Sequence, residues 1–225
     1  MEIRLRLMNN KLPFYHLIRK SNLKNGKSPL ILMIHGYGSN EQDLFSFSRA
    51  IPENFTIISL RGDIEFQYNE YAWYNIFWDY NGVKSYDIEK AKKSRDNILK
   101  SLDICKDLYE IDPDNITLMG FSQGAMLVNA VALTYPEKIN NIISLSGAFD
   151  PYIINLSNSK HLKKLSFYIS HGLNDEILPF DFSKKSLKIL DDNNLNYIFE
   201  EYPIGHTVSP DNFKSMLNWL IEKTN

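Results

Sequence analysis

The chain has a single cysteine among its 225 residues, and this scarcity excludes two kinds of site. One cysteine, Cys105, cannot form an intrachain disulfide framework and cannot supply the thiolates of a zinc cluster. It falls on the apolar stripe of a predicted helix, so we interpret it as a packing residue. The five histidines are dispersed along the chain and give no metal-binding spacing. We therefore expect no metal and no cofactor.

Long apolar runs and an excess of charge of one sign are missing as well. No run is long enough to span a membrane, and residues 1–20 lack the apolar core of a signal peptide. We therefore expect a cytoplasmic protein without a transmembrane segment. The 25 basic and 27 acidic side chains leave a net charge of −2, which gives no basic surface for nucleic acid. The sequence is compatible with a homodimer but does not determine the oligomeric state.

The rest of the composition is typical of a globular protein, with 44% hydrophobic and 23% charged residues. No internal repeat, low-complexity tract or long linker rich in proline, glycine or serine interrupts the chain. A chain of this length buries about 70% of the surface that it exposes when unfolded. We therefore expect residues 1–225 to form one domain.

Apolar runs at seven places predict strands that alternate with helical patterns. The predicted strands are 14–19, 30–35, 55–60, 115–119, 141–145, 165–171 and 197–202. Several are continuously apolar, which is typical of strands covered on both faces of a sheet. Residues 88–109 carry one apolar stripe at helical spacing, and Ser209 followed by Pro210 is a helix start for the last helix. This alternation predicts an α/β fold with a mostly parallel, doubly wound sheet flanked by helices.

The most informative motif is Gly-Phe-Ser-Gln-Gly at 120–124, between a predicted strand and a small apolar helical segment, 125–135. A Gly-x-Ser-x-Gly turn between strand and helix presents the nucleophile of a serine hydrolase, here Ser122. The glycines remove side chains that would clash in so sharp a turn. The helix behind it directs its N–H groups and positive dipole end at the reaction site. Because glycine and serine are common, the bare pattern occurs by chance in about one in ten such chains, so its context must decide.

That context consists of four segments, each of which directly follows a predicted strand. They are His35-Gly36-Tyr37-Gly38, Ser122, Asp175 and His206. Ligands of doubly wound sheets bind beyond the carboxyl ends of the strands. These segments are therefore expected to meet at one sheet edge and to form a composite site there.

A serine hydroxyl needs a base within hydrogen-bond reach, and we assign this role to His206, in the loop before the final helix. The other histidines have simpler interpretations. His16 lies within a strand pattern and His161 in a polar loop. His35 and His171 each close a strand and precede a glycine, where backbone groups near the site can satisfy them.

The base in turn needs an acid to hold its tautomer and to stabilise the imidazolium. Asp175, after the penultimate strand, is our first choice. Asp150 is an open competitor, because it also follows a strand, although its place before Pro151 suits a residue that turns the chain.

A tetrahedral intermediate needs preorganised donors for its oxyanion. We expect one from the backbone N–H of Gln123, immediately after the nucleophile. We expect the second from the backbone N–H of Tyr37, because Gly36 and Gly38 let that loop approach closely. The alternative for this loop is a plain glycine turn.

Together these residues resemble the phospholipase/carboxylesterase family of α/β-hydrolases, which includes the acyl-protein thioesterases. The resemblance runs from about residue 30 to the carboxyl terminus. It rests on His-Gly-Tyr-Gly at 35–38, Gly-Phe-Ser-Gln-Gly-Ala at 120–125, His-Gly-x-x-Asp-x-x-x-Pro at 171–179 and Gly-His at 205–206. It implies the α/β-hydrolase fold, a Ser122–Asp175–His206 triad and an oxyanion hole at Tyr37 and Gln123. The chemistry of the residues gives the same set, so the resemblance adds the substrate class, which is acyl esters.

Residues 63–82 depart from the family by their density of aromatic side chains. The aromatics are Phe66, Tyr68, Tyr71, Trp73, Tyr74, Phe77, Trp78 and Tyr80. Trp73-Tyr74 resembles a pair that family members carry here, and we expect it to bind substrate as part of an acyl pocket or flap. The alternative is an ordinary loop pinned by buried rings.

The sequence thus predicts a serine esterase that cleaves carboxylic esters of short to medium acyl chains. Acyl-protein thioesterase and lysophospholipase activities are alternatives, since the leaving-group pocket decides between them. A peptidase of this architecture usually needs an added domain to select peptides. A non-catalytic binding domain would lack a triad residue, and a dienelactone-type hydrolase would have cysteine in place of Ser122.

Overall fold

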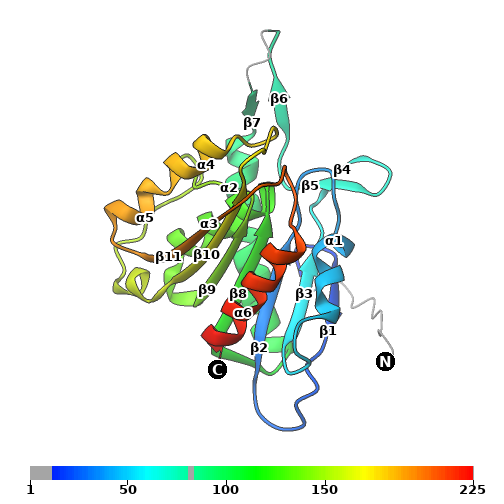
Figure 1. Ribbon diagram of the computed structural model, residues 1–225. Coiled ribbons are helices and arrows are strands. Elements are labelled where there is room, and N and C mark those ends of the chain that lie inside the picture. The colour runs from blue at the N-terminus through cyan, green and yellow to red at the C-terminus, as the bar shows by residue number, and fades with distance from the viewer. Residues whose placement is uncertain (1–11, 81–83, 225) are drawn as a thin grey trace.

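The computed structural model of the protein describes residues 12–80 and 84–224, and its centre is a seven-stranded sheet. The strand order is β1-β3-β2-β8-β9-β10-β11 (Figure 1). Its strands are β1 (His16–Arg19), β2 (Ser28–Ile34), β3 (Thr56–Leu60), β8 (Ile111–Phe121), β9 (Asn141–Leu145), β10 (Ser166–Gly172) and β11 (Asn196–Tyr202). Only β1 runs antiparallel to its neighbour within this sheet. The mostly parallel sheet is the one that the sequence predicts.

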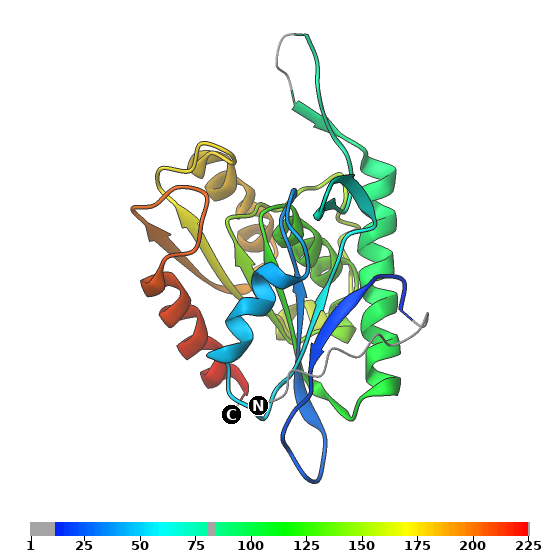
Figure 2. The ribbon, with the colours of Figure 1, turned by 90° about the vertical axis from the view of Figure 1, so that its right-hand side faces the viewer.

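Helices cover both faces of the sheet, as Figures 1 and 2 show. The α-helices are α1 (Gln42–Phe45), α2 (Ile88–Leu108), α3 (Gln123–Thr134), α4 (Phe180–Ser186), α5 (Lys188–Asp192) and α6 (Pro210–Thr224). Short 3₁₀ turns are η1 (Ser46–Arg49), η2 (Pro136–Lys138) and η3 (Lys160–Lys164). Side chains of α2 and α3 pack on one face of the sheet, and those of α1 and α6 pack on the other.

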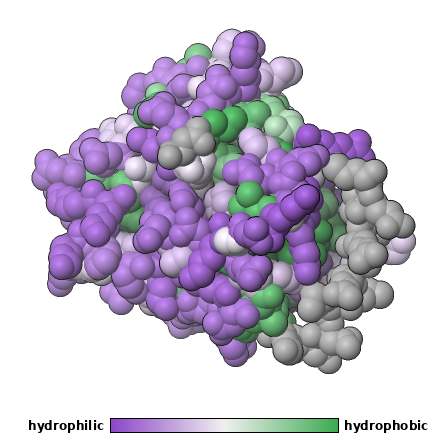
Figure 3. Space-filling view, turned by 90° about the horizontal axis from the view of Figure 1, so that it is seen from below, coloured by the Kyte–Doolittle hydropathy of each residue, from purple (hydrophilic) through white to green (hydrophobic). Residues whose placement is uncertain are grey.

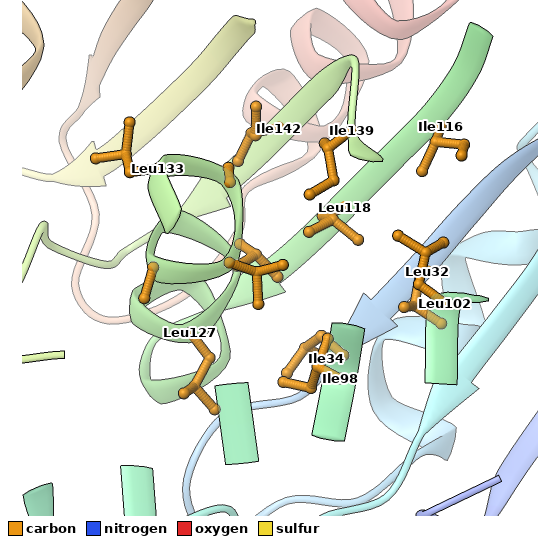
Figure 4. Close-up of a cluster of buried hydrophobic side chains, with 14 of the residues drawn as sticks. Leu32, Ile34, Ile98, Leu102, Ile116, Leu118, Leu127, Leu133, Ile139 and Ile142 are labelled. Atoms are coloured by element: carbon orange, nitrogen blue, oxygen red, sulfur yellow. The ribbon is translucent and has the colours of Figure 1, made fainter. Parts of the chain in front are cut away.

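Successive residues of the central strands point alternately into these two cores. On the first face, Leu32 and Leu118 meet Ile98 of α2 and Leu127 of α3, as the close-up in Figure 4 shows. On the second face, Met33 belongs to the cluster that includes the α6 side chains. The continuous apolar runs of the sequence are thus buried on both faces, which holds the carboxyl ends of the strands in fixed register.

The seven predicted strands all lie in this sheet, and the prediction for 141–145 agrees with β9 at both ends. The Ser209 hydroxyl accepts a hydrogen bond from the backbone N–H of Asn212 at 3.2 Å, so the predicted start of the last helix is confirmed. Cys105 is fully buried on α2, as its place on the apolar stripe indicates. Burial raises the pKa of its thiol to about 12, which suits a packing residue.

Two hairpins in the aromatic segment are additions to the predicted elements. One pairs β4 (Ile64–Gln67) with β5 (Glu70–Ala72), and the other pairs β6 (Ile76–Trp78) with β7 (Lys84–Tyr86). Both lie beyond the carboxyl ends of the sheet strands, and β6 and β7 project well above the body in both views (Figures 1 and 2). These strands have three or four residues each and expose aromatic rings, so they lack the long apolar run that marks a sheet strand.

Within the described residues, no helix has the length and apolar character needed to cross a membrane. The amino-terminal segment in which we expect no signal peptide, 1–20, lies in part outside the described residues, because the description begins at residue 12. The expected cytoplasmic location and single-domain organisation stay predictions.

The turn between β8 and α3 packs tightly against β2. A Cβ placed on Gly124 would lie 2.0 Å from the carbonyl oxygen of Ile34 and 2.6 Å from that of His35. Both obstacles are backbone atoms of a central strand and its end, so neither can move without disturbing the sheet. Glycine at this position therefore lets α3 begin directly against β2.

This contact predicts that Gly124→Ala lowers the free energy of unfolding by about 3 kcal/mol, because a methyl group has no room there. Gly205→Ala is the matched control: its Cβ would meet only the Asn174 carbonyl oxygen, at an ordinary 3.7 Å. Its free energy of unfolding should stay within about 0.5 kcal/mol of the wild type. Urea denaturation of the three proteins measures both values, and equal stability of the two variants would contradict the close approach.

Candidate active site

Ser122 lies at the tip of the turn between β8 and α3 with a backbone conformation that side chains rarely adopt. Its φ is 52° and its ψ is −117°, outside the usual regions for a residue other than glycine. Its N–H donates to the carbonyl oxygen of Leu145 at 2.9 Å, and its carbonyl oxygen accepts from the N–H of Met126 at 3.1 Å. Such strain persists only where the surroundings hold it, and it is common at active sites.

The Ser122 hydroxyl is the first member of a chain of three polar side chains. Its Oγ lies 2.8 Å from Nε2 of His206, and Nδ1 of that ring lies 2.6 Å from Oδ2 of Asp175. Because the carboxylate can only accept, Nδ1 carries the proton and Nε2 is left to accept from the serine hydroxyl. The structure thus brings together the three side chains that the sequence predicts at this sheet edge.

The loops that carry Asp175 and His206 are joined by their backbones. The N–H of Leu173 donates to the carbonyl oxygen of Tyr202 at 2.8 Å, and that of Asn174 donates to Ile204 at 3.0 Å. A Cβ on Gly172 would lie only 2.3 Å from the carbonyl oxygen of Gly205, so glycine permits this approach. The separation of acid and base is therefore set by backbone contacts.

Asp175 is held from its other side by its own loop. Its Oδ1 accepts hydrogen bonds from the backbone N–H groups of Ile177 at 2.9 Å and Leu178 at 2.8 Å. Its side chain has no exposed surface, whereas that of His206 is 15% exposed. The Asp175 carboxylate is thus held in place and shielded from solvent, whereas the His206 ring is partly exposed.

Asp150, the competing acid, binds other partners. Its Oδ2 accepts from the hydroxyl of Tyr86, and its Oδ1 accepts from the backbone N–H of Tyr152 at 2.9 Å. The second bond turns the chain after β9, which is the structural role that Pro151 suggests. Because the histidine bonds to Asp175 and not to Asp150, the geometry favours Asp175 as the acid.

The loop after β2 lies directly beside the nucleophile. A Cβ on Gly36 would be 3.5 Å from Cβ of Ser122, so this loop and the serine turn are in contact. Gly38 lies two residues further along this loop. It has a φ of 79° and donates its N–H to the carbonyl oxygen of Tyr71 at 3.0 Å. Among the described residues no hydrogen bond uses the backbone N–H of Tyr37.

Gln123 follows Ser122, and its buried side chain bonds the turn to the aromatic segment. Its Oε1 accepts from the backbone N–H of Trp73 at 3.0 Å, and its Nε2 donates to the carbonyl oxygen of Tyr74 at 2.9 Å. The sequence indicates a role only for the backbone N–H of Gln123. The role of its side chain is not visible there, since the bonded residues lie 49 and 50 positions away in the chain.

The expected substrate-binding role of Trp73 and Tyr74 stays a prediction, although both rings are buried. Trp73 has no exposed surface and Tyr74 is 2% exposed. The Trp73 indole N–H donates to the carbonyl oxygen of His35 at 2.9 Å, and the Tyr74 hydroxyl contacts Met126 of α3. Indole N–H and phenol O–H groups find such partners when buried. These rings pack beneath the turn and support it, which is the buried-ring alternative for this pair.

His35 is satisfied by backbone groups, as the sequence suggests. Its Nδ1 lies 2.7 Å from the carbonyl oxygen of Gly36, and its Nε2 accepts from the backbone N–H of Gly62 at 3.0 Å. Burial lowers the pKa of the ring to about 4, so it is neutral at physiological pH. The ring therefore ties the loop after β2 to the start of the aromatic segment without adding a charge beside the site.

His171, at the end of β10, contacts the acid itself. Its Nε2 lies 2.8 Å from the carbonyl oxygen of Leu178 and 3.2 Å from Oδ2 of Asp175. The backbone partner is the kind expected from the sequence, whereas the contact with Asp175 is not among the expectations. The His-Gly-x-x-Asp spacing gives a signal for it, because a tight turn over four residues brings the two side chains together.

Comparison with known proteins bears on the family and the fold of this chain. The family model described as Phospholipase/Carboxylesterase matches residues 20–224. An acyl-protein thioesterase 1 of Aspergillus fumigatus is 31% identical over 151 residues, 60% of this chain and 61% of the relative. A probable carboxylesterase of Arabidopsis thaliana, named SOBER1-like, is 30% identical over 116 residues, 50% of this chain and 44% of the relative. The chain thus spans less than two thirds of the length of these two curated relatives.

The solved structure of the Bacillus cereus carboxylesterase has the same fold. It superimposes with a TM-score of 0.80 at 21% identity, and the match covers 95% of this chain and 96% of that chain. With the parallel sheet and its flanking helices, this similarity identifies the α/β-hydrolase fold that the sequence resemblance implies.

The hydrogen bonds of the two aspartates predict unequal effects of their removal. Asp175→Asn should lower kcat by about a thousandfold or more, because an amide does not enforce the tautomer of His206 or stabilise its cation. Asp150→Asn should lower kcat by less than about tenfold, because its partners are Tyr86 and the Tyr152 backbone. Initial rates with p-nitrophenyl butyrate measure both. A larger loss of kcat in Asp150→Asn than in Asp175→Asn would assign the role of the acid to Asp150.

Proposed function

This chain belongs to the phospholipase/carboxylesterase family, and from that premise we propose that it is a serine esterase acting on carboxylic esters of short to medium acyl chains. The observation that carries the proposal is the unbroken chain of hydrogen-bond distances from Ser122 through His206 to Asp175, 2.8 Å and then 2.6 Å. The strained backbone of Ser122 supports it, since such strain is common where a side chain reacts.

In the proposed first step, Oγ of Ser122 attacks the carbonyl carbon of the ester while Nε2 of His206 takes the hydroxyl proton. Asp175 keeps the Nδ1 proton on the far side of the ring and stabilises the imidazolium that forms. The burial of Asp175 supports this role, because a charge interaction is stronger where water is excluded.

The negative charge that develops on the carbonyl oxygen is assigned to the backbone N–H groups of Tyr37 and Gln123. The contact between the Gly36 loop and Ser122 supports this assignment. So does the position of Gln123 as the first residue of α3, because the first N–H groups of a helix have no partner within the helix. Preorganised donors of this kind are worth about 3 kcal/mol each in related acyl transfers.

The second half of the reaction uses the same groups. The imidazolium of His206 gives its proton to the leaving alcohol, which departs and leaves the acyl group on Ser122. Water then enters, loses a proton to His206 and attacks the acyl carbonyl. The bond between the acyl carbon and Oγ of Ser122 breaks as His206 returns the proton to Oγ, and the carboxylic acid is released. The side chain of His206 is 15% exposed, which supports its contact with both alcohol and water.

The surface around this edge of the sheet favours apolar substrates. Exposed aromatic side chains gather on its two hairpins: Phe66, Tyr68, Phe77, Trp78 and Tyr80. Phe66 stacks on the ring of Tyr37 with 4.9 Å between ring centres, which brings an apolar surface to the loop beside the nucleophile. The opposite end of the molecule, seen from below in Figure 3, is mainly hydrophilic. A gathering of exposed apolar side chains marks a place where an apolar ligand or surface is met.

Acyl-protein thioesterase activity is the second candidate, because the Aspergillus fumigatus relative bears that name. Oxygen esters and thioesters pass through the same acyl-enzyme, so the proposed groups serve both. A lysophospholipase differs again only in the leaving group. The proposed substrate is therefore an acyl compound, and the leaving group distinguishes the three activities.

The proposed nucleophile predicts that Ser122→Ala hydrolyses p-nitrophenyl butyrate at least about a thousandfold more slowly than the wild type, with an unchanged circular dichroism spectrum. A fluorophosphonate probe should label the wild type once and leave the variant unlabelled. A non-catalytic binding domain would give no label on either protein. Undiminished turnover by the variant would overturn the assignment of Ser122.

The exposed aromatic rings predict a dependence on acyl length. Values of kcat/KM for p-nitrophenyl esters should rise from acetate to chains of about eight carbons, because each buried methylene contributes up to about 0.8 kcal/mol. Phe66→Ser should flatten this rise and affect acetate least. Leu23→Ser, an exposed apolar side chain in the loop before β2 at the opposite end, is the matched control. Equal profiles for all three proteins would contradict a role for Phe66 in acyl binding.

A further inference from the structure

The loop after β2, which carries the proposed oxyanion donor at Tyr37, is bonded to the β4–β5 hairpin. Gly38 donates its N–H to the carbonyl oxygen of Tyr71 at 3.0 Å. The N–H of Tyr71 donates in turn to the carbonyl oxygen of Ser39 at 2.9 Å, and these two residues form an isolated β-bridge. The hairpin thus holds the two residues that directly follow Tyr37.

The same loop ends at Glu41, directly before α1, in a buried ion pair with Arg61. The Glu41 side chain is only 1% exposed. Its Oε2 accepts from Nε of Arg61 at 2.5 Å, and its Oε1 accepts from Nη2 at 2.6 Å. A buried carboxylate costs several kcal/mol unless it is paired. Two parallel bonds fix direction as well as distance, so this pair ties the end of the loop to the residue that follows β3.

Arg61 also contacts the hairpin residue that bonds the loop. Its guanidinium carbon lies 4.6 Å from the centre of the Tyr71 ring, and its Nη1 donates to the Tyr71 hydroxyl at 3.3 Å. The ring of Tyr15 lies on the same guanidinium at 4.2 Å. A cation over an aromatic ring is attracted to it. One side chain therefore connects the end of the loop at Glu41 to the hairpin that holds its middle.

Binding an anionic group of a substrate is the other role open to an arginine at this edge of the sheet. Here the Nε and Nη2 donors are taken by Glu41, and two tyrosine rings pack on the guanidinium. Its charge is thus already paired. A buried ion pair adds little net stability compared with apolar side chains of the same volume. What the pair supplies is the fixed geometry of the loop.

We propose that Arg61 and Glu41 are positioning residues: their ion pair holds the loop after β2 at the place where the backbone N–H of Tyr37 meets the oxyanion beside Ser122. The proposal rests on the proposed function, since it assumes the oxyanion hole described there. It assigns neither side chain a contact with substrate. Because the carbonyl oxygen gains its negative charge only as the reaction proceeds, the pair acts on the transition state and not on substrate binding.

The test uses Arg61→Lys and Glu41→Gln, which loosen the pair without leaving a buried charge unpaired. Lysine keeps the positive charge and lacks the planar fork. Glutamine keeps the shape and one acceptor oxygen. A displacement of about 1 Å in a reacting group costs up to about a hundredfold in rate, so we expect kcat for p-nitrophenyl butyrate to fall by about tenfold or more in each variant. The loss should be equal for the acetate, because the loop meets the carbonyl group and not the acyl chain.

Arg19→Lys is the control for the loss of a guanidinium fork. Arg19 of β1 donates to the carbonyl oxygens of Ile51 at 2.9 Å and Pro52 at 2.6 Å. It lies in register with Ile57, near the amino end of β3 and so away from the site. This variant should lose stability and keep the kcat of the wild type. Rates of all the proteins are divided by the concentration of active sites, titrated with a fluorophosphonate.

Two ketones with the same alkyl chain separate the transition state from the ground state. With a trifluoromethyl ketone, Oγ of Ser122 bonds to the carbonyl carbon, the hydroxyl proton passes to His206 and the carbonyl oxygen becomes an oxyanion. The methyl ketone is far less electrophilic and measures binding without that adduct. In Arg61→Lys and Glu41→Gln, the inhibition constant of the trifluoromethyl ketone should rise by the factor by which kcat falls. That of the methyl ketone should stay unchanged.

The double variant Arg61→Lys/Glu41→Gln tests whether the two residues act as one unit. If they act through a single contact, its kcat should be no lower than about that of the weaker single variant. Losses that multiply would show that the two side chains act separately and would contradict a shared role.

Two further results overturn the proposal. An unchanged kcat in both single variants would leave the ion pair a structural contact only. An equal rise in both inhibition constants would mean that the pair shapes the substrate site and not the oxyanion hole. If Arg61→Lys does not fold, Glu41→Gln alone decides, because it leaves the partly exposed arginine charged and the buried position neutral. Failure of the proposed function is recognised separately, since a fluorophosphonate would then not label Ser122 of the wild type.

Discussion

The constraint on which the rest of the site depends is the backbone of Ser122, held at a φ of 52°. For a residue other than glycine this backbone conformation costs about 1–3 kcal/mol, so contacts with neighbouring residues must stabilise it. Gly124 lets α3 pack closely against the carbonyl oxygens at the end of β2. The Gln123 side chain forms hydrogen bonds with the backbone of Trp73 and Tyr74. The hydroxyl therefore stands at a fixed point above the sheet, and every other group of the site is placed relative to it.

Close backbone contacts place those groups. The Gly36 loop touches Ser122 from one side, and the turn at Gly172 meets the loop of His206 from the other. At both points a Cβ would collide or crowd, so glycine brings together segments that lie far apart in the chain. Side chains then complete an arrangement set by main-chain atoms, which explains how Asp175 can be buried and still reach His206. Precision of this kind is what transition-state stabilisation requires.

The sheet and the three meeting side chains could be predicted from sequence, because apolar runs and the turn motif at 120–124 are local signals. The burial of Trp73 and Tyr74 could not, since aromatic rings suit an acyl pocket and a packed core equally well. The partners of Gln123 and the second contact of Asp175 depend on tertiary structure, and no pattern in the sequence specifies which carbonyl a side chain meets. The short exposed strands β4 to β7 are held by pairing rather than by an apolar face, so periodicity does not reveal them.

In the proposed reaction, the turn that carries Ser122 and Gln123, the loop that carries Tyr37 and the ring of His206 act together on a single acyl carbon. A crystal structure of the protein inhibited by a diethyl phosphonate tests it most directly, because phosphorus mimics the tetrahedral carbon. We predict a bond from phosphorus to Oγ of Ser122, with the phosphoryl oxygen within about 3 Å of the backbone nitrogens of Tyr37 and Gln123. An adduct on another residue, or a phosphoryl oxygen turned away from both nitrogens, would contradict it.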